Sequence, residues 1–343
     1  MFPSSFAPVS VVVGCVDGSW GPVEPMANQG ALSLRAVGLH YGQVAFEGLR
    51  AVSIDGRLHV FRPDLHHRRL ARSLERLSMP AVPGPVLGGA LAALLDRVAI
   101  PEDLGPGWFL YLRPLVVAVD EDWSMSGGRQ FELHVLTGWT APAYHDVPEI
   151  RALADSAGRR ALSGRAGVVK VPANYGSAMP AQHRARSVGA YTVLWLTPGS
   201  RVVEEFTSMN ALVVVDGVLH APAPGPEVLD GVIRRSVLEL AGDAGVVTSD
   251  EPVVWPHPDR SDGRVSALLA TATAVGLVGV EQVAEVSPDG AVQTWRSPAD
   301  PPVEVAELRR IVDDVLVGRR AEHWWADAPT LAAWPFGDGD SRS

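Results

Sequence analysis

The sequence predicts a mixed α+β (mixed α/β) protein of two domains, and three observations support this class. The chain has 343 residues, which exceeds one domain of ordinary size. Hydrophobic residues make up 47% of it and charged residues 20%, so there is enough apolar material for sizeable cores. Strand-like segments rich in β-branched and aromatic residues alternate with segments whose apolar residues recur at helical spacing. We expect a small α+β domain at 1–137, an interdomain loop at 138–148 and a larger domain at 149–343.

The first domain is expected to combine antiparallel strands with helices. Its strands are predicted from β-branched and aromatic residues at 57–62, 108–119 and 131–137. Its helices are predicted from apolar spacing at 65–77 and 87–98, on either side of a proline-rich break at 79–85. The segment GWTAPAYHDVP at 138–148 has a glycine, prolines and no periodicity, and this composition is typical of a connector.

The second domain is expected to alternate helices with short apolar strands. Its helices are predicted from apolar spacing at 177–188, 232–241 and 303–317. Its strands are predicted at 192–196, 211–215 and 218–220, the last two joined by a tight Asp216-Gly217 turn. The small, apolar stretch 267–279 is predicted to be buried strand and turn. Pro172 and Asn174 predict a turn directly after Lys170, at the end of a strand.

Composition and charge exclude several classes of function. The formal net charge is −10, so the overall field repels polyanions and argues against nucleic-acid binding. No apolar run approaches the roughly 18 residues of a membrane span, and the first residues lack the basic region of a signal peptide. Cys15 is the single cysteine, which excludes an internal disulfide framework and a thiolate metal cluster. We therefore expect a soluble, cytoplasmic protein with no metal and no nucleic-acid or membrane partner.

Lys170 is the single lysine among 29 basic residues. Lysine and arginine serve equally well on a solvated face, so a lone lysine in an arginine-rich chain suggests a chemical role. An amine in a partly desolvated site can lose its proton and attack a carbonyl, which arginine cannot do. Lys170 is therefore a candidate Schiff-base nucleophile, and the alternative is a surface lysine that remained by chance.

Ordered motifs connect Lys170 to a known family. Lys170 precedes Asn174-Tyr175, a VLWL strand follows, and Glu205 then precedes Met209-Asn210. The other motifs are HYGQVAFEGLR at 40–50, FRPDLHHRRLARS at 61–73, YLRP at 111–114, VLDGVIRRS at 228–236 and LATATAVG at 269–276. Over residues 20–290 this order resembles the branched-chain amino acid aminotransferases, which are class IV aminotransferases and pyridoxal phosphate enzymes of fold type IV. The resemblance implies a smaller N-terminal α+β domain and a larger C-terminal, β-barrel-like domain with helices.

The resemblance implies pyridoxal 5′-phosphate as the cofactor. Lys170 would form a Schiff base with the cofactor aldehyde and, once released, would move the proton at the substrate's Cα. Glu205 would face the pyridine nitrogen, and Tyr175 would bond the phenolic oxygen. The remaining cofactor-binding residues would hold the phosphate through a guanidinium, backbone N–H groups and a hydroxyl. They are Arg69, Gly231, Val232, Ile233 and Thr273.

The resemblance also implies the residues that contact the amino acid and 2-oxo acid substrates. They are Tyr41, Phe46, Tyr111, Arg113, Trp139, Thr273 and Ala274. Arg113 would receive the second carboxylate of glutamate, and Tyr111, Thr273 and Ala274 would bind the carboxylate next to the reacting carbon. Tyr41 would reach into the site of a neighbouring subunit, which implies a homodimer. Phe46 and Trp139 would form apolar walls, and ordinary core packing is the alternative for both.

The activity implied is transfer of an amino group between a branched-chain or related hydrophobic L-amino acid and 2-oxoglutarate, in ping-pong half-reactions. Some motif positions depart from the family pattern: Pro172-Ala173 replaces a glycine pair, Asp230 a proline and Ala272 a glycine. These departures favour an enzyme specialised for secondary metabolism. Two alternatives stay open, a fold type IV lyase of the aminodeoxychorismate lyase kind and a cofactor-binding relic without catalysis. The FEGLR and YLRP motifs favour the aminotransferase.

Overall fold

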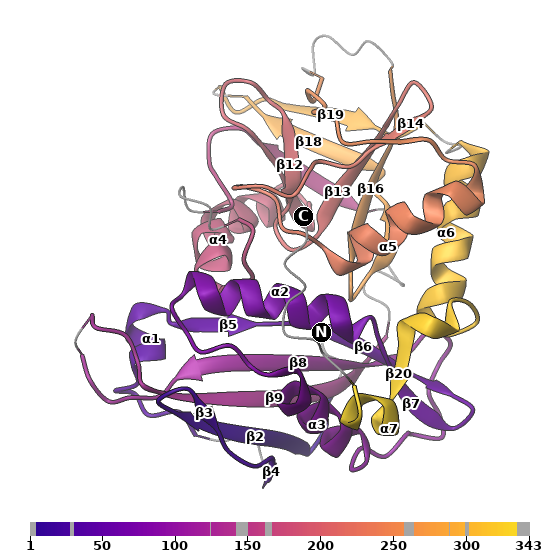
Figure 1. The fold of residues 1–343 in the computed structure, drawn as a ribbon. Helices are drawn as coiled ribbons and strands as arrows, with labels where there is room; N and C mark the ends of the chain where they lie inside the picture. Colours follow the sequence, from indigo (N-terminus) through magenta and orange to yellow (C-terminus); the bar gives the residue numbers. More distant parts are fainter. Residues whose placement is uncertain are drawn as a thin grey trace. The chain divides into compact units, whose positions relative to one another are not determined.

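The computed structural model describes residues 5–27, 31–123, 125–141, 150–161, 167–256, 264–287, 289–298 and 302–334. The chain divides into two compact units, whose elements are labelled in Figure 1. The first unit comprises Met1–Ala143, Val169–Pro172 and Val317–Ser343, and the second comprises Tyr144–Val168 and Ala173–Leu316. The chain therefore passes from one unit to the other at four positions.

The first unit contains an antiparallel sheet whose described strands follow the order β20-β7-β6-β8-β9-β2-β3, with β1, β4 and β5 paired to β9, β2 and β8. The strands are β1 (Ser5–Phe6), β2 (Val9–Val16), β3 (Ser19–Trp20), β4 (Glu24–Ala27), β5 (Val44–Phe46), β6 (Leu49–Ile54), β7 (Arg57–Phe61), β8 (Phe109–Ala118), β9 (Gln130–Thr140) and β20 (Trp325–Asp327). The helices are α1 (Val37–Tyr41), α2 (Pro63–Arg76), α3 (Gly84–Leu95), α7 (Ala328–Ala332) and the 3-10 turn Glu322–Trp324.

The core of this unit follows from the alternating pattern of its strands. Along β9, Phe131, Leu133 and Val135 are buried, and the residues between them are partly exposed. A strand with this period presents one apolar face, which must be covered. The apolar helix α3 covers it, since Leu87 and Leu91 belong to the same hydrophobic cluster as the buried residues of β2 and β9.

The C-terminal segment belongs to the first unit, although the sequence analysis assigns it to the second domain. Strand β20 pairs antiparallel with β7, and α7 packs against α3. The ring centroids of Trp324 and Trp325 lie 5.9 and 5.0 Å from that of Phe61, and the Arg62 N–H donates to the Trp324 carbonyl (2.7 Å). Long-range strand pairing thus assigns residues that local pattern cannot place.

The second unit contains a mixed sheet whose described strands follow the open order β15-β14-β13-β12-β11-β10-β18-β19, with β16 paired to β13 and β17 to β16. The strands are β10 (Arg151–Asp155), β11 (Thr192–Leu196), β12 (Val203–Phe206), β13 (Asn210–Val215), β14 (Val218–His220), β15 (Thr248–Ser249), β16 (Val265–Ala272), β17 (Gly276–Gly279), β18 (Gln282–Val286) and β19 (Val292–Arg296). The helices are α4 (Pro172–Ser187), α5 (Val232–Ala241), α6 (Val303–Leu316) and the 3-10 turn Gly242–Ala244.

Helix α4 connects the parallel strands β10 and β11, because parallel neighbours need a crossover connection. Its small residues Ala178, Ala181 and Ala185 are buried in one cluster with Val193 and Trp195 of β11. Helices α5 and α6 contact each other, and α6 contacts β17. The two sheets with their helices confirm the predicted α+β class.

Most predicted elements agree with the structure, but no strand ends at Lys170, since residues 167–171 form a turn and irregular backbone instead. Strand β11 and helix α5 have the predicted bounds. Helix α4 begins at Pro172, where the sequence predicts a turn, because proline in the first turn of a helix loses no hydrogen bond. Strand β9 continues through Thr140 into the predicted connector. Residues 142–149 lie outside the described residues, so the domain boundary at 138–148 stays a prediction.

Among the helices that the structure describes, none is both long and apolar enough to cross a membrane.

Candidate active site

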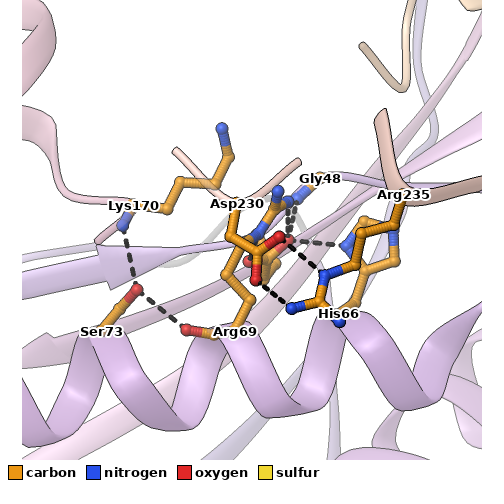
Figure 2. A network of polar contacts seen from close by, with 8 residues as sticks. Gly48, His66, Arg69, Ser73, Lys170, Asp230 and Arg235 are labelled. Carbon is orange, nitrogen blue, oxygen red and sulfur yellow. Dashed lines mark hydrogen bonds and ion pairs between the residues drawn. The ribbon is translucent and has the colours of Figure 1, made fainter. Parts of the chain in front are cut away.

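In the first unit, the backbone of Lys170 forms hydrogen bonds with two secondary-structure elements. Its N–H donates to Ser73 Oγ of α2 (2.9 Å), and its carbonyl accepts the N–H of Phe46 from β5 (3.2 Å). The Ser73 hydroxyl in turn donates to the Arg69 carbonyl one turn earlier in α2 (3.0 Å), as Figure 2 shows. A buried serine therefore connects the candidate nucleophile to the helix that carries the candidate phosphate arginine.

The Lys170 side chain lies beside other predicted site residues of the same unit. Its Nζ is 4.9 Å from the centroid of the Phe46 ring, and the Arg113 Cζ is 4.6 Å from that centroid. Both are cation–π distances. Arg113 Nη2 also donates to Tyr111 Oη (2.8 Å). The structure thus brings Lys170, Phe46, Tyr111 and Arg113 together.

Gly48 of the FEGLR motif allows the Tyr111 phenol to take this place. A Cβ atom at Gly48 would overlap the Tyr111 hydroxyl and lie 2.8 Å from its Cζ. Any side chain at this position would push the phenol away from Arg113. The glycine therefore has a packing role in the site that only the structure identifies.

Arg69 is buried in an ion pair. Its Nε and Nη2 donate to the two carboxylate oxygens of Glu47, each at 2.7 Å, and the His66 Nδ1 donates to Glu47 Oε2, also at 2.7 Å. Burial would raise the pKa of Glu47, but Arg69 and His66 outweigh it and hold that pKa well below its usual range. The carboxylate is ionised and offsets part of the Arg69 charge.

The surroundings of His66 favour its neutral form. Burial lowers its pKa, an effect that the Glu47 carboxylate opposes and that the charges of Arg69 and Lys170 reinforce. Since an ionised carboxylate can only accept, the proton of the imidazole lies on Nδ1. In the part of the chain that the structure describes, the buried Nε2 has no hydrogen-bond partner.

Two predicted substrate residues of the first unit have other surroundings. Trp139 is 6% exposed and belongs to the hydrophobic core, and its place in a substrate wall stays a prediction. Tyr41, at the end of α1, is 45% exposed, and its hydroxyl donates to the Trp123 carbonyl (2.7 Å).

In the second unit, Glu205 of β12 is buried among donors. Arg160 forms an ion pair with its Oε1, the Leu229 N–H donates to the same oxygen (3.1 Å), and Asn210 Nδ2 donates to Oε2 (3.0 Å). A guanidinium and N–H donors favour the charged form of a carboxylate that they contact. Glu205 is therefore suited to accept a hydrogen bond from a protonated ring nitrogen.

Glu204 has a different environment, although it is adjacent in the chain. Successive residues of a strand point to opposite faces, and Glu204 accepts a hydrogen bond from Thr197 Oγ1 (3.0 Å). Burial raises the pKa of Glu204, and the Thr197 hydrogen bond opposes this. The two adjacent glutamates therefore have different partners, and a positively charged group pairs with Glu205.

The start of α5 is suited to an anion. The N-cap residue Gly231 has no side chain to bond the first N–H groups of the helix, to which Val232 and Ile233 belong. A Cβ at Gly231 would overlap Asn210 Oδ1 and lie 3.0 Å from its Cγ, so the close approach requires glycine. Asn210 also donates to the Leu229 carbonyl (2.8 Å), which connects the Glu205 strand to the loop before α5.

The other predicted residues of the second unit lie at element ends. Tyr175 is in the first turns of α4 and is half-buried. Thr273 and Ala274, also half-buried, lie in the turn between β16 and β17. The Thr271 hydroxyl closes this turn by donating to the Gly276 carbonyl (2.8 Å). Among the described residues, no group of His, Cys, Asp and Glu side chains is placed to hold a metal ion.

Sequence reasoning misses the residues that form hydrogen bonds and ion pairs with the predicted site residues. Glu47, His66 and Ser73 lie inside the quoted motifs, but no local pattern shows that they contact Arg69 or Lys170. Arg160 lies next to Arg159, and the sequence cannot distinguish the two. In the structure the Arg160 side chain is 4% exposed and pairs with Glu205, whereas the Arg159 side chain is 43% exposed and pairs with Glu227.

The fold and these residues define an enzyme class. The family model "Amino-transferase class IV" matches residues 44–283, which is more than half of the chain, so the chain belongs to the class IV aminotransferases. Within that class, the relatives described next place it in the branched-chain aminotransferase family.

The chain is 33% identical over 252 residues to branched-chain-amino-acid transaminase 1 of Bacillus subtilis (strain 168). That alignment covers 71% of this chain and 70% of the relative. It is 35% identical over 227 residues to the probable branched-chain-amino-acid aminotransferase of Staphylococcus epidermidis (strain ATCC 12228 / FDA PCI 1200). That alignment covers 65% of this chain and 63% of the relative. Among solved structures, the branched-chain amino acid aminotransferase from Thermobaculum terrenum in its PLP form matches with a TM-score of 0.72 at 21% identity. The match covers 93% of this chain and 98% of that structure's chain. This likeness confirms the fold type IV architecture.

Proposed function

We propose that this chain is a pyridoxal phosphate-dependent aminotransferase that moves an amino group between a branched-chain or related hydrophobic L-amino acid and 2-oxoglutarate. The observation that carries the proposal is Lys170, whose backbone is bonded to α2 and β5 and whose amine lies against the Phe46 ring. The names of the Bacillus and Staphylococcus relatives support the activity. The Thermobaculum structure, named as a PLP form, supports the cofactor.

The residues of each unit fit this cofactor. Bound pyridoxal phosphate supplies an aldehyde that bonds to amines and a ring that withdraws electrons from the carbon losing its proton. Lys170 has the amine for the aldehyde and is the base that moves the proton at the substrate's Cα. Glu205, paired with Arg160, would accept a hydrogen bond from the ring nitrogen. Tyr175 would bond the phenolic oxygen.

The phosphate would be held at the start of α5. The N–H groups of Val232 and Ile233 follow a glycine N-cap, and such a helix start binds anions. Arg69 and the Thr273 hydroxyl would add a cation and a donor. Because Glu47 already pairs with Arg69, this guanidinium would act mainly as an oriented hydrogen-bond donor rather than as a full charge.

Arg113 and Phe46 support the use of two different substrates. Phe46 offers an apolar ring, and the Arg113 guanidinium beside it can bond a side-chain carboxylate in two places. Glutamate and a hydrophobic amino acid would therefore use the same residues in turn. Tyr111, oriented by Arg113, would bond the carboxylate next to the reacting carbon, together with the turn at Thr273 and Ala274.

The proposal also covers the oligomeric state, the cellular location and the metabolic role of the protein. We expect a cytoplasmic homodimer in which the exposed ring of Tyr41 reaches the site of the other subunit. The departures at Pro172, Asp230 and Ala272 support a substrate outside primary metabolism.

Borohydride reduction of the cofactor-loaded protein tests the role of Lys170. Besides the N-terminal amine, the chain has no other primary amine, so peptide mapping should find the label on Lys170. Lys170→Arg should give a folded protein without label at that position. Label on the N-terminus alone would contradict the proposal.

Glu205→Gln and Glu204→Gln form a matched pair. We expect Glu205→Gln to retain the cofactor but slow the half-reaction by orders of magnitude, because the ring loses its anionic partner. Glu204→Gln should react at nearly the wild-type rate. The reverse order would show that the ring nitrogen faces the other carboxylate.

Single-turnover absorption with different amines tests the substrate class. We expect glutamate to convert the bound cofactor to its aminated form and a hydrophobic 2-oxo acid to reverse this. If glutamate and hydrophobic amino acids leave the spectrum unchanged while another amine is consumed with release of pyruvate, the lyase replaces the aminotransferase.

A further inference from the structure

An ion pair holds the chain at the entrance to α5. Asp230 directly precedes the N-cap Gly231, and Arg235 is the fourth residue of the helix. Arg235 Nε donates to Asp230 Oδ1 (2.7 Å) and its Nη2 to Oδ2 (2.6 Å), the bidentate contact visible in Figure 2. Arginine and carboxylate geometries match in this arrangement.

In many helices these two positions carry apolar side chains that pack together and fix the angle at which the chain enters the helix. Here a charged pair takes the same positions. We propose that the Asp230–Arg235 pair is an ionic staple, in which Arg235 neutralises the Asp230 carboxylate beside the first turn of α5, where a phosphate group would bind. This inference rests on the proposed function, in which that turn binds the cofactor phosphate.

Burial makes the two partners unequal. The side chain of Asp230 is 3% exposed and that of Arg235 is 45% exposed. An unpaired Arg235 would be hydrated, whereas an unpaired Asp230 would keep a buried negative charge next to the phosphate site. The neighbouring Arg234 is directed elsewhere, since its Nη2 donates to the Ala221 carbonyl (3.1 Å). The function of Arg235 is therefore to offset Asp230.

This inequality predicts an asymmetric response to mutation. We expect Arg235→Gln to weaken the binding of pyridoxal phosphate about tenfold, because the helix start then faces an uncompensated carboxylate. Asp230→Asn should change the affinity for pyridoxal phosphate by less than about threefold, since the exposed arginine stays hydrated. The double variant should return to within about threefold of wild type, because no charge is left buried.

Pyridoxal, which lacks the phosphate, separates the electrostatic effect from general damage to the site. Each variant is titrated, as the full chain freed of cofactor, with pyridoxal phosphate and with pyridoxal. Arg235→Gln should affect only the phosphorylated compound. Arg264→Gln is the matched control, because Arg264 forms a similar pair with Asp216 (2.9 Å) at an exposed hairpin and should leave both affinities unchanged.

The outcomes distinguish this inference from the proposed function. Equal affinity of wild type and Arg235→Gln for pyridoxal phosphate overturns the ionic staple, as does an equal loss for both compounds. Failure of the wild type to bind either compound contradicts the proposed function instead. Thermal unfolding without cofactor gives a separate readout of the staple: Arg235→Gln should lower the midpoint more than Asp230→Asn, and equal midpoints would contradict the buried charge.

Discussion

At the scale of single residues, the Ser73 hydroxyl is a hydrogen-bond partner of the Lys170 backbone. It accepts the Lys170 N–H and donates to the Arg69 carbonyl. Ser73→Ala removes this acceptor from a buried N–H, and we expect a loss of about 1–3 kcal/mol in the free energy of unfolding. Urea unfolding measures it.

Ser236 of α5 provides the matched control for that prediction. It is also buried, and its hydroxyl donates to the Val232 carbonyl one turn earlier (3.0 Å). No backbone N–H donates to it in the contacts that the structure describes. Ser236→Ala should therefore cost less than Ser73→Ala, and an equal cost would show that the Lys170 contact contributes nothing.

The Glu47–His66 pair predicts how stability depends on pH. The folded-state pKa of Glu47 is lowered, so its contribution is complete above its unfolded value of about 4.3 and is lost as the pH falls below it. The pKa of His66 is also lowered. Below about pH 6.5, the imidazole therefore takes up a proton more readily in the unfolded state than in the folded state. Both effects destabilise the protein as the pH falls.

Urea unfolding between pH 8 and pH 4.5 measures the His66 part of this effect. His66→Gln should flatten the decline of stability below about pH 6.5 by up to 1.4 kcal/mol per pH unit, the value for one proton. A slope identical to that of wild type would mean that His66 takes up its proton in the folded protein.

At the scale of elements, the start of α5 depends on a residue without a side chain. A Cβ at Gly231 would overlap the Asn210 amide, which also bonds Glu205. We expect Gly231→Ala to destabilise the protein by about 1–3 kcal/mol and to weaken cofactor binding. Gly242, at the other end of α5, has helical φ and open space around its Cβ position, so Gly242→Ala should be neutral or stabilising. Comparable losses in both variants would attribute the effect to the helix and not to Asn210.

At the scale of the whole molecule, the units are interleaved along the chain. The first unit needs β20 and the Lys170 segment, which follow most of the second unit in sequence or interrupt it. We therefore expect residues 1–143, expressed alone, to lack cooperative thermal unfolding, because the edge of β7 and the Trp325 contacts with Phe61 are missing. The full chain is the control. A sharp transition of the fragment would show that the C-terminal segment is dispensable.

Much of the secondary structure, and the choice of Lys170 as candidate nucleophile, could be predicted from local residue patterns. Residues 192–196 and 232–241 have the predicted bounds because side-chain periodicity and β-branching act on neighbouring residues. The single lysine and the ordered motifs identified the family, which the family model confirms. The start of α4 at Pro172 was missed, because a proline both ends and begins helices.

The residues that support the site could be identified only from the folded arrangement of the chain. Arg160 and Arg159 are neighbours of the same type, yet one is buried against Glu205 and the other is exposed. Trp139 proved to be part of the core, and Ser73 proved to hold Lys170. The Arg160–Glu205 and Ser73–Lys170 contacts join residues 45 and 97 positions apart. Packing over such separations follows from the whole fold, and no local pattern of residues encodes it.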